Sequence, residues 1–146
     1  MAGSVGCGAV VQPWPPNPSP ARRSAPKRHH AVILPVGNLF AGIPATLASE
    51  QFDELLHTES CRLERIVSSG QATPAGEWYD QAWDEWVVLL QGQAALLFAG
   101  EDAPRLLNPG DYVYIPAHYR HRVEQTSETP PAVWLALHLA GSDAGC

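Results

Sequence analysis

From residue 61 onward, apolar and polar side chains alternate with a period of two, which is the pattern of half-buried β-strands. In the first such run, Leu63 and Val67 share one face, and Glu64 and Ile66 share the other. The pattern predicts strands over residues 61–69, 77–82, 85–91, 94–99, 105–107, 112–115, 121–125 and 133–139. Gly, Pro, Asn and Asp separate these runs at short intervals, which indicates an all-β sandwich or barrel.

The segment before these strands has a different spacing. Phe52, Leu55 and Leu56 would share one face of a helix, and Ser49 is a residue type that caps helix N-termini. Acidic residues fill the first turns, where the helix dipole favours them. The sequence therefore predicts a short packing helix within a lead-in of residues 36–60, followed by a barrel over residues 61–141.

The N-terminal region is rich in proline. Eight of the fourteen prolines fall within the first 44 residues, where they remove backbone donors and favour extended conformations. We therefore expect residues 1–35 to form a disordered basic tail, and residues 142–146 to form a flexible C-terminus. A targeting segment and a translated upstream region remain alternatives for the tail. Met1 is the only methionine, so the sequence offers no internal start with which to test the second alternative.

Composition supports one acidic domain. The chain has 146 residues, of which 45% are hydrophobic, enough for a single core. Its formal net charge is -6, but residues 1–49 hold four basic residues and no acid, whereas residues 50–146 hold five basic and fifteen acidic residues. Such an acidic domain is not expected to bind nucleic acid or anionic membranes.

Apolar runs and cysteines add two expectations about location. No apolar run approaches the roughly 20 residues that a membrane-spanning helix requires. The three cysteines, Cys7, Cys61 and Cys146, form no C-x-x-C pair, so a disulfide framework is not expected. The sequence thus predicts a protein of a reducing compartment, the cytoplasm.

Two segments have a spacing beyond that of a generic strand. The first, EWVVLLQG, runs from Glu85 to Gly92, and the second, GDYVYIPAHYRH, runs from Gly110 through Pro116 to His121. The two glycines are expected to adopt positive φ at turns between antiparallel strands. The proline is expected to end a strand where no backbone donor is needed.

The inward faces of these segments carry the candidate chemistry. A period of two places Glu85 beside Val87 and Leu89 on one face, and His121 beside Val123 on another. A carboxylate among aliphatic side chains is costly unless it meets a metal, a base or a hydrogen-bond donor. Glu85 and His121 are therefore the best candidates for catalytic residues, Glu85 as acid or base and His121 as ligand or proton partner.

Together the two segments resemble the paired motifs of the cupin superfamily, in particular its small single-domain, type-2, RmlC-like members. The first cupin motif has a Gly, two His one residue apart, a Glu three or four residues later, and a Gly after six more; the second is Gly-x5-Pro-x-Gly-x2-His. The resemblance covers about residues 60–140. It implies a double-stranded β-helix, or jelly-roll, barrel that binds a small-molecule ligand and forms a homodimer.

The chain departs from the cupin pattern at the two histidines of the first motif. A three-residue spacer puts Tyr79 and Gln81 in their places, and a four-residue spacer puts Trp78 and Asp80 there. Neither alternative contains a histidine. Of the three His and one Glu that hold a divalent metal in the family, only the Glu and the last His are present.

Two other histidines could complete a metal site. His118 lies three residues before His121, and His138 lies in the apolar run WLALHLA. With Glu85 and His121 they would form a mixed nitrogen and oxygen site suited to Fe, Mn, Ni or Zn. The alternatives are an exposed rim residue for His118, a neutral core residue for His138, and a metal-free proton-transferring pair of Glu85 and His121.

Aromatic residues around the motifs predict the lining of a ligand pocket, because such pockets combine aromatic walls with a few convergent polar groups. We expect Tyr79, Gln81 and Trp83 to contact a ligand or cofactor. Three classes of function remain open: a small-molecule enzyme with or without a metal, a ligand-binding or sensing module, and a structural or partner-binding protein. The fold cannot choose among them.

Overall fold

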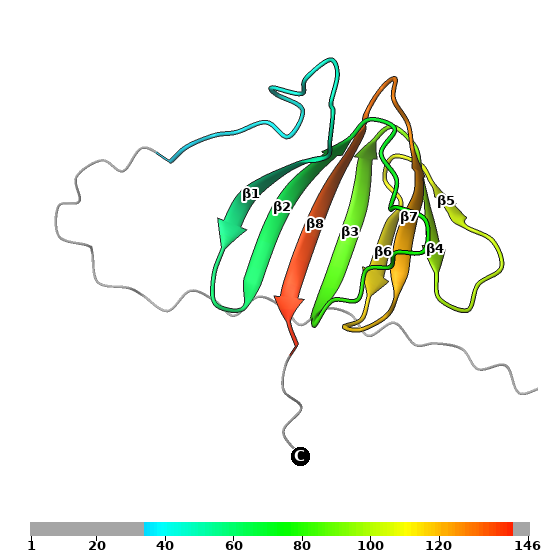
Figure 1. The fold of residues 1–146 in the computed structure, drawn as a ribbon. Coiled ribbons are helices and arrows are strands. Elements are labelled where there is room, and N and C mark those ends of the chain that lie inside the picture. Colours follow the sequence, from blue (N-terminus) through cyan, green and yellow to red (C-terminus); the bar gives the residue numbers. More distant parts are fainter. Residues whose placement is uncertain (1–33, 142–146) are drawn as a thin grey trace, which may run out of the picture. The chain divides into compact units, whose positions relative to one another are not determined.

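The computed structural model describes residues 34–141, and this part of the chain contains eight β-strands and no helix. Predictions about residues 1–33 and 142–146 lie outside it. The strands, labelled in Figure 1, are β1 (Gln51–His57), β2 (Cys61–Ser68), β3 (Trp83–Gln91), β4 (Ala94–Phe98), β5 (Arg105–Leu107), β6 (Tyr112–Ile115), β7 (His121–Thr126) and β8 (Ala132–Ala140). The segment contains no apolar helix of membrane-spanning length.

The strands form two antiparallel sheets around one core. The larger sheet has the order β1-β2-β8-β3-β6, and the smaller has the order β5-β4-β7 (Figure 1). Both sheets contribute to one cluster of buried side chains: Val87, Leu89, Ala94, Leu96, Phe98, Leu107, Ile115, Ala132, Trp134 and Ala136. The all-β prediction is confirmed, and seven of its strands occur close to their predicted bounds.

The predicted helix before the barrel is wrong, because its residues form β1. Strand β1 pairs with β2 in antiparallel register, with Asp53 directly opposite Arg65. The guanidinium of Arg65 donates to the Asp53 carboxylate over 2.7 Å, and hydrogen bonds from Gln51 and Arg65 lower the pKa of Asp53. A helical spacing of apolar residues is a local signal, and pairing with β2 outweighs it.

The strand predicted over residues 77–82 is also absent from the structure. Only Tyr79 forms a bridge, in which its amide donates to the His121 carbonyl over 2.8 Å and the His121 amide donates back over 3.2 Å. The segment therefore runs beside β7 without becoming a strand of either sheet.

Both motif glycines have the predicted backbone conformation. Gly92 lies between β3 and β4 with φ of 80°, and Gly110 lies just before β6 with φ of 96°. A Cβ at residue 92 would lie 2.9 Å from both the Cα of Ala132 and the carbonyl oxygen of Pro131, whereas residue 110 has open space around it. Position 92 therefore needs glycine for two reasons, and position 110 for one.

Candidate functional site

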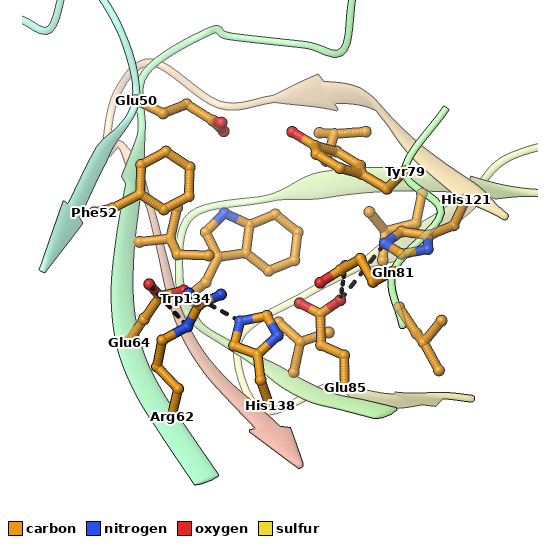
Figure 2. A pocket seen from close by; sticks show the side chains of 15 residues that line it. Glu50, Phe52, Arg62, Glu64, Tyr79, Gln81, Glu85, His121, Trp134 and His138 are labelled. Atoms are coloured by element: carbon orange, nitrogen blue, oxygen red, sulfur yellow. Dashed lines mark hydrogen bonds and ion pairs between the residues drawn. The ribbon is translucent and has the colours of Figure 1, made fainter. Parts of the chain in front are cut away.

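One cavity of about 310 Å³ lies within the barrel, among residues 34–141. Strands from both sheets and the segment before β3 supply its walls, so residues far apart in the sequence meet there (Figure 2). Its lining residues are Glu50, Phe52, Arg62, Glu64, Ile66, Tyr79, Gln81, Glu85, Val87, Leu96, Ile115, His121, Val123, Trp134 and His138. Its volume is at the lower end of the range typical of small-molecule pockets.

Glu85 and His121 meet on one side of this cavity. Glu85 reaches it from β3 and His121 from the first residue of β7, and Oε2 of Glu85 lies 3.6 Å from Nε2 of His121 (Figure 2). Their side chains are 10% and 7% exposed, so bulk water screens their interaction weakly. Gln81 donates its amide hydrogen to the same Glu85 oxygen over 2.9 Å.

The hydrogen-bond partner of Nδ1 in the His121 ring shows which tautomer faces Glu85. Nδ1 of His121 lies 3.0 Å from the backbone carbonyl oxygen of Tyr119. A carbonyl oxygen can only accept, so Nδ1 carries a hydrogen and donates it. In the neutral ring, Nε2 then has a lone pair directed at the Glu85 carboxyl, and Nε2 carries a hydrogen only when the ring is doubly protonated.

The segment before β3 is fixed to β7 by several hydrogen bonds. Thr73 donates its amide to the Val123 carbonyl over 2.8 Å and accepts the Val123 amide on its hydroxyl over 2.9 Å. On the outside, the Trp78 ring lies beneath the guanidinium groups of Arg120 and Arg122, at 5.3 and 5.8 Å from its centroid. These contacts hold the backbone that carries Gln81 into the cavity.

Tyr79 contributes a phenol near the open end of the cavity. Its residue is 40% exposed, yet burial of the hydroxyl, followed by the charge of Glu50, raises the pKa of Tyr79 above its ordinary value. The hydroxyl therefore stays protonated at neutral pH and can donate to a ligand. The ring of Tyr79 also lies against the His121 ring, with centroids 5.5 Å apart.

A second group of charges lies on the larger sheet. Arg62, His138 and Glu85 occupy neighbouring register positions on β2, β8 and β3. Nε2 of His138 lies 3.1 Å from the Glu64 carboxylate, whose other oxygen lies 3.4 Å from Nε of Arg62. His138 is therefore bonded to Glu64 on one side and lies beside Glu85 on the other (Figure 2).

The structure brings most of the expected site residues together. Glu85, His121, Tyr79, Gln81 and His138 all line the cavity. Of the two spacings to Glu85, the three-residue one is therefore correct, since it places Tyr79 and Gln81 on the inward side of the segment before β3. The alternative residues, Trp78 and Asp80, point elsewhere, as the contacts of Trp78 with the two arginines show.

Two expected site residues lie outside the cavity. His118 has a side chain that is 70% exposed, and its Nδ1 lies 2.8 Å from the Asp80 carboxylate. Its backbone has φ of 61°, so the turn after β6 directs the ring to the rim. Trp83, at the start of β3, is also not among the residues that line the cavity.

Sequence reasoning missed part of the lining. Phe52 and Glu50 reach the cavity because β1 is a strand, and Trp134 is a wall residue on β8. Arg62 and Glu64 share one face of β2, and the period of two in the sequence shows that they do. The period does not show which face of β2 turns inward, so these two residues were not expected in the cavity.

The donors of the cavity do not fit the four-ligand metal site expected of the fold. Across residues 34–141, no three His, Cys, Asp or Glu side chains are grouped closely enough to hold a metal ion. Glu85 and His121 face each other, but the positions of the two missing histidines hold Tyr79 and Gln81. His138 points its Nε2 to Glu64 instead.

The two sheets and their central cavity define a small jelly-roll barrel with a ligand-sized pocket. The chain belongs to the cupin family, since residues 65–138 match the family described as Cupin domain. No curated protein matched the sequence. The expected family is thereby confirmed.

Solved structures agree with this assignment. A protein from Ralstonia eutropha JMP134, named a putative mannose-6-phosphate isomerase, is 46% identical with a TM-score of 0.71, over 73% of this chain and 99% of that one. A cupin superfamily protein from Desulfitobacterium hafniense DCB-2 is 19% identical with a TM-score of 0.60, over 79% of this chain and 100% of that one. The second similarity shows the shared fold alone.

Proposed function

We propose that the barrel binds a small hydroxylated carbonyl compound and that Glu85 and His121 move a proton on it, as an isomerase does. One observation carries the proposal. A carboxylate and an imidazole face each other over 3.6 Å inside a cavity of about 310 Å³, and both side chains are nearly buried. Paired groups of this kind act as general base and general acid.

The contacts of the pair assign a role to each residue. The hydrogen bond from Gln81 to Oε2 holds the Glu85 carboxyl in place inside the cavity, and we assign Glu85 as the base. The bond from Nδ1 to the Tyr119 carbonyl orients the ring, so Nε2 of His121 is the atom that delivers or receives the second proton. Tyr79 stays protonated and supplies a further donor beside the pair.

The proposed reaction is a balanced proton shift. At the start of the proposed reaction Glu85 is ionised and the His121 ring carries a hydrogen on both nitrogens, of which the Nδ1 hydrogen stays on the Tyr119 carbonyl. Glu85 takes the proton from the carbon next to the carbonyl group, and His121 gives its Nε2 proton to the carbonyl oxygen, which forms an enediol. Glu85 then returns its proton to the former carbonyl carbon, and the other hydroxyl of the enediol gives its proton to Nε2 of His121. These two transfers complete the isomerisation. No oxidant or reductant is consumed.

The comparison with solved structures supports this class of reaction. The Ralstonia eutropha relative, which shares 46% identity and aligns over 99% of its length, is named a putative mannose-6-phosphate isomerase. The steps proposed for this chain use its own side chains alone.

Deuterium exchange tests the proposal. Hydroxy-aldehydes and hydroxy-ketones that raise the melting temperature of the protein are incubated with it in D2O, and deuterium at carbon is measured by mass spectrometry. We expect incorporation with the unmodified protein and a loss of at least about 100-fold in Glu85→Gln and His121→Gln, the usual size of a general acid–base contribution.

A matched control comes from β1. Glu54 lies outside the cavity lining and is half exposed, so Glu54→Gln should exchange deuterium at the unmodified rate. Binding of such compounds without exchange, or exchange that survives Glu85→Gln, would overturn the proposal. The first of these results would instead support a ligand-binding module.

A further inference from the structure

We infer that the cavity selects ligands without negative charge, taking hydroxyl- or ammonium-bearing molecules in preference to their phosphate esters. The inference rests on the proposed function and names its substrate class. It concerns this chain's own pocket, and it departs from the phosphorylated sugar in the name of the Ralstonia eutropha relative.

The charges that line the cavity are mostly negative. Three carboxylates, those of Glu50, Glu64 and Glu85, face one guanidinium, that of Arg62. A phosphate group that enters this cavity would lose its water shell and would be repelled by the carboxylates, and both effects disfavour its binding.

The single guanidinium is already paired with a carboxylate. Nε of Arg62 lies 3.4 Å from the Glu64 carboxylate, and 41% of the Arg62 side chain is exposed. Phosphate sites in proteins usually use arginine forks or several backbone N–H groups. A phosphate that accepted hydrogen bonds from the other nitrogens of Arg62 would lie beside the Glu64 carboxylate, and repulsion between the two anions would weaken its binding.

The two cavity histidines direct their hydrogens at other groups of the protein. His121 donates through Nδ1 to the Tyr119 carbonyl, and His138 contacts the Glu64 carboxylate through Nε2. A carboxylate accepts, so Nε2 of His138 is the donor. In its neutral form the His138 ring has no second N–H to offer an anion, and the Nε2 hydrogen that His121 carries in the proposed reaction lies beside the Glu85 carboxylate. An anion that reached either ring would therefore lie close to a carboxylate.

The open end of the cavity favours the opposite charge. Figure 2 shows Glu50, Phe52 and Tyr79 grouped at one end of the cavity, away from Glu85 and His138. The Glu50 carboxylate accepts a hydrogen bond from the uncharged Ser68 hydroxyl over 2.6 Å. A carboxylate beside aromatic rings suits an ammonium group or a row of hydroxyls.

Binding of three matched probes tests the inference. Mannose, glucosamine and mannose 6-phosphate are titrated into the full chain at constant ionic strength, and the indole resonance of Trp134, a buried wall residue, reports occupancy. We expect mannose or glucosamine to bind at least about 10-fold more tightly than mannose 6-phosphate. Tighter binding of glucosamine than of mannose would identify the ammonium group as the preferred head group, and the reverse would identify hydroxyls.

Charge-neutralising variants make the test specific. Glu50→Gln and Glu64→Gln should each narrow the preference against mannose 6-phosphate by about 10-fold, because each removes a carboxylate and the second also frees Arg62. Glu54→Gln, on β1 outside the lining, should leave the preference unchanged. This control separates the cavity from the overall charge of the protein.

Two results would overturn the inference. One is binding of mannose 6-phosphate at least as tight as that of mannose and glucosamine; the other is failure of all three probes to perturb Trp134. Deuterium exchange is read in the same samples. Exchange with a tightly bound phosphate ester would refute charge selection alone, whereas selective binding without exchange would refute proton transfer alone.

Discussion

Replacing Gly92 by alanine should destabilise the barrel much more than the same change at Gly110. Both residues have φ well inside the left-handed region, at 80° and 96°. An L-residue in that region costs about 1–2 kcal/mol, so Gly110→Ala, in open space, should lose that amount and no more.

Position 92 carries a second cost. A new Cβ would lie 2.9 Å from the Cα of Ala132 and 2.9 Å from the carbonyl oxygen of Pro131, and backbone atoms cannot rotate away as a side chain can. Overpacking of this kind costs about 1–3 kcal/mol. Gly92→Ala should therefore lose about 2–5 kcal/mol in total.

Thermal and urea unfolding, followed by tryptophan fluorescence, measures both variants. One kcal/mol corresponds to about 4–8 °C for a domain of this size, so the melting temperature of Gly92→Ala should fall at least about 4 °C below that of Gly110→Ala. Equal losses, or a larger loss at Gly110, would refute the argument that close backbone approach at the β3–β4 turn demands glycine.

Three further predictions concern the surroundings of the site. Because the pKa of Asp53 is lowered, its contribution to stability is complete above the ordinary value of 3.8 and is lost as pH falls through the lowered value. In Asp53→Asn the free energy of unfolding should therefore fall less with decreasing pH, by up to about 1 kcal/mol, as urea melts between pH 2 and 5 would show. Trp78→Ala removes two cation–π contacts worth about 1–2 kcal/mol together, and should speed hydrogen exchange of the Tyr79 amide; unchanged exchange would mean that Trp78 does not hold this segment. We expect a homodimer through the edge strand β1, where Leu55 is 46% exposed. Light scattering should then show Leu55→Asp as a monomer and Leu106→Asp, on β5, as a dimer, and a monomeric unmodified protein would contradict this expectation.

The parts of the fold that the sequence could predict are those in which each strand has its own signal. A period of two places Glu85, Val87 and Leu89 on one face of a strand, and the motif position of Glu85 indicated that this face lies inward. The inward direction of His121 follows in the same way. These residues need no knowledge of their partners to be placed.

The parts that could not be predicted depend on pairing between segments. The residues of β1 have the spacing of a helix, and only the register with β2 makes them a strand that brings Phe52 to the cavity. The choice between Gln81 and Asp80 depended on how a segment outside both sheets lies against β7, which the spacing to Glu85 leaves open. The cluster of Arg62, Glu64 and His138 likewise forms only when β2 pairs with β8.

The protonation of the His121 ring decides whether Glu85 and His121 form an acid–base pair. Long-range ¹H–¹⁵N spectra distinguish the two ring nitrogens and show which of them carries a hydrogen. We expect a hydrogen on Nδ1, bonded to the Tyr119 carbonyl, and an Nε2 resonance that moves when Glu85 is replaced by Gln but not when Glu54 is. A neutral ring with its hydrogen on Nε2 and a bare Nδ1, or an Nε2 resonance that does not respond to Glu85→Gln, would contradict the claim that Glu85 and Nε2 of His121 act as a pair inside the barrel.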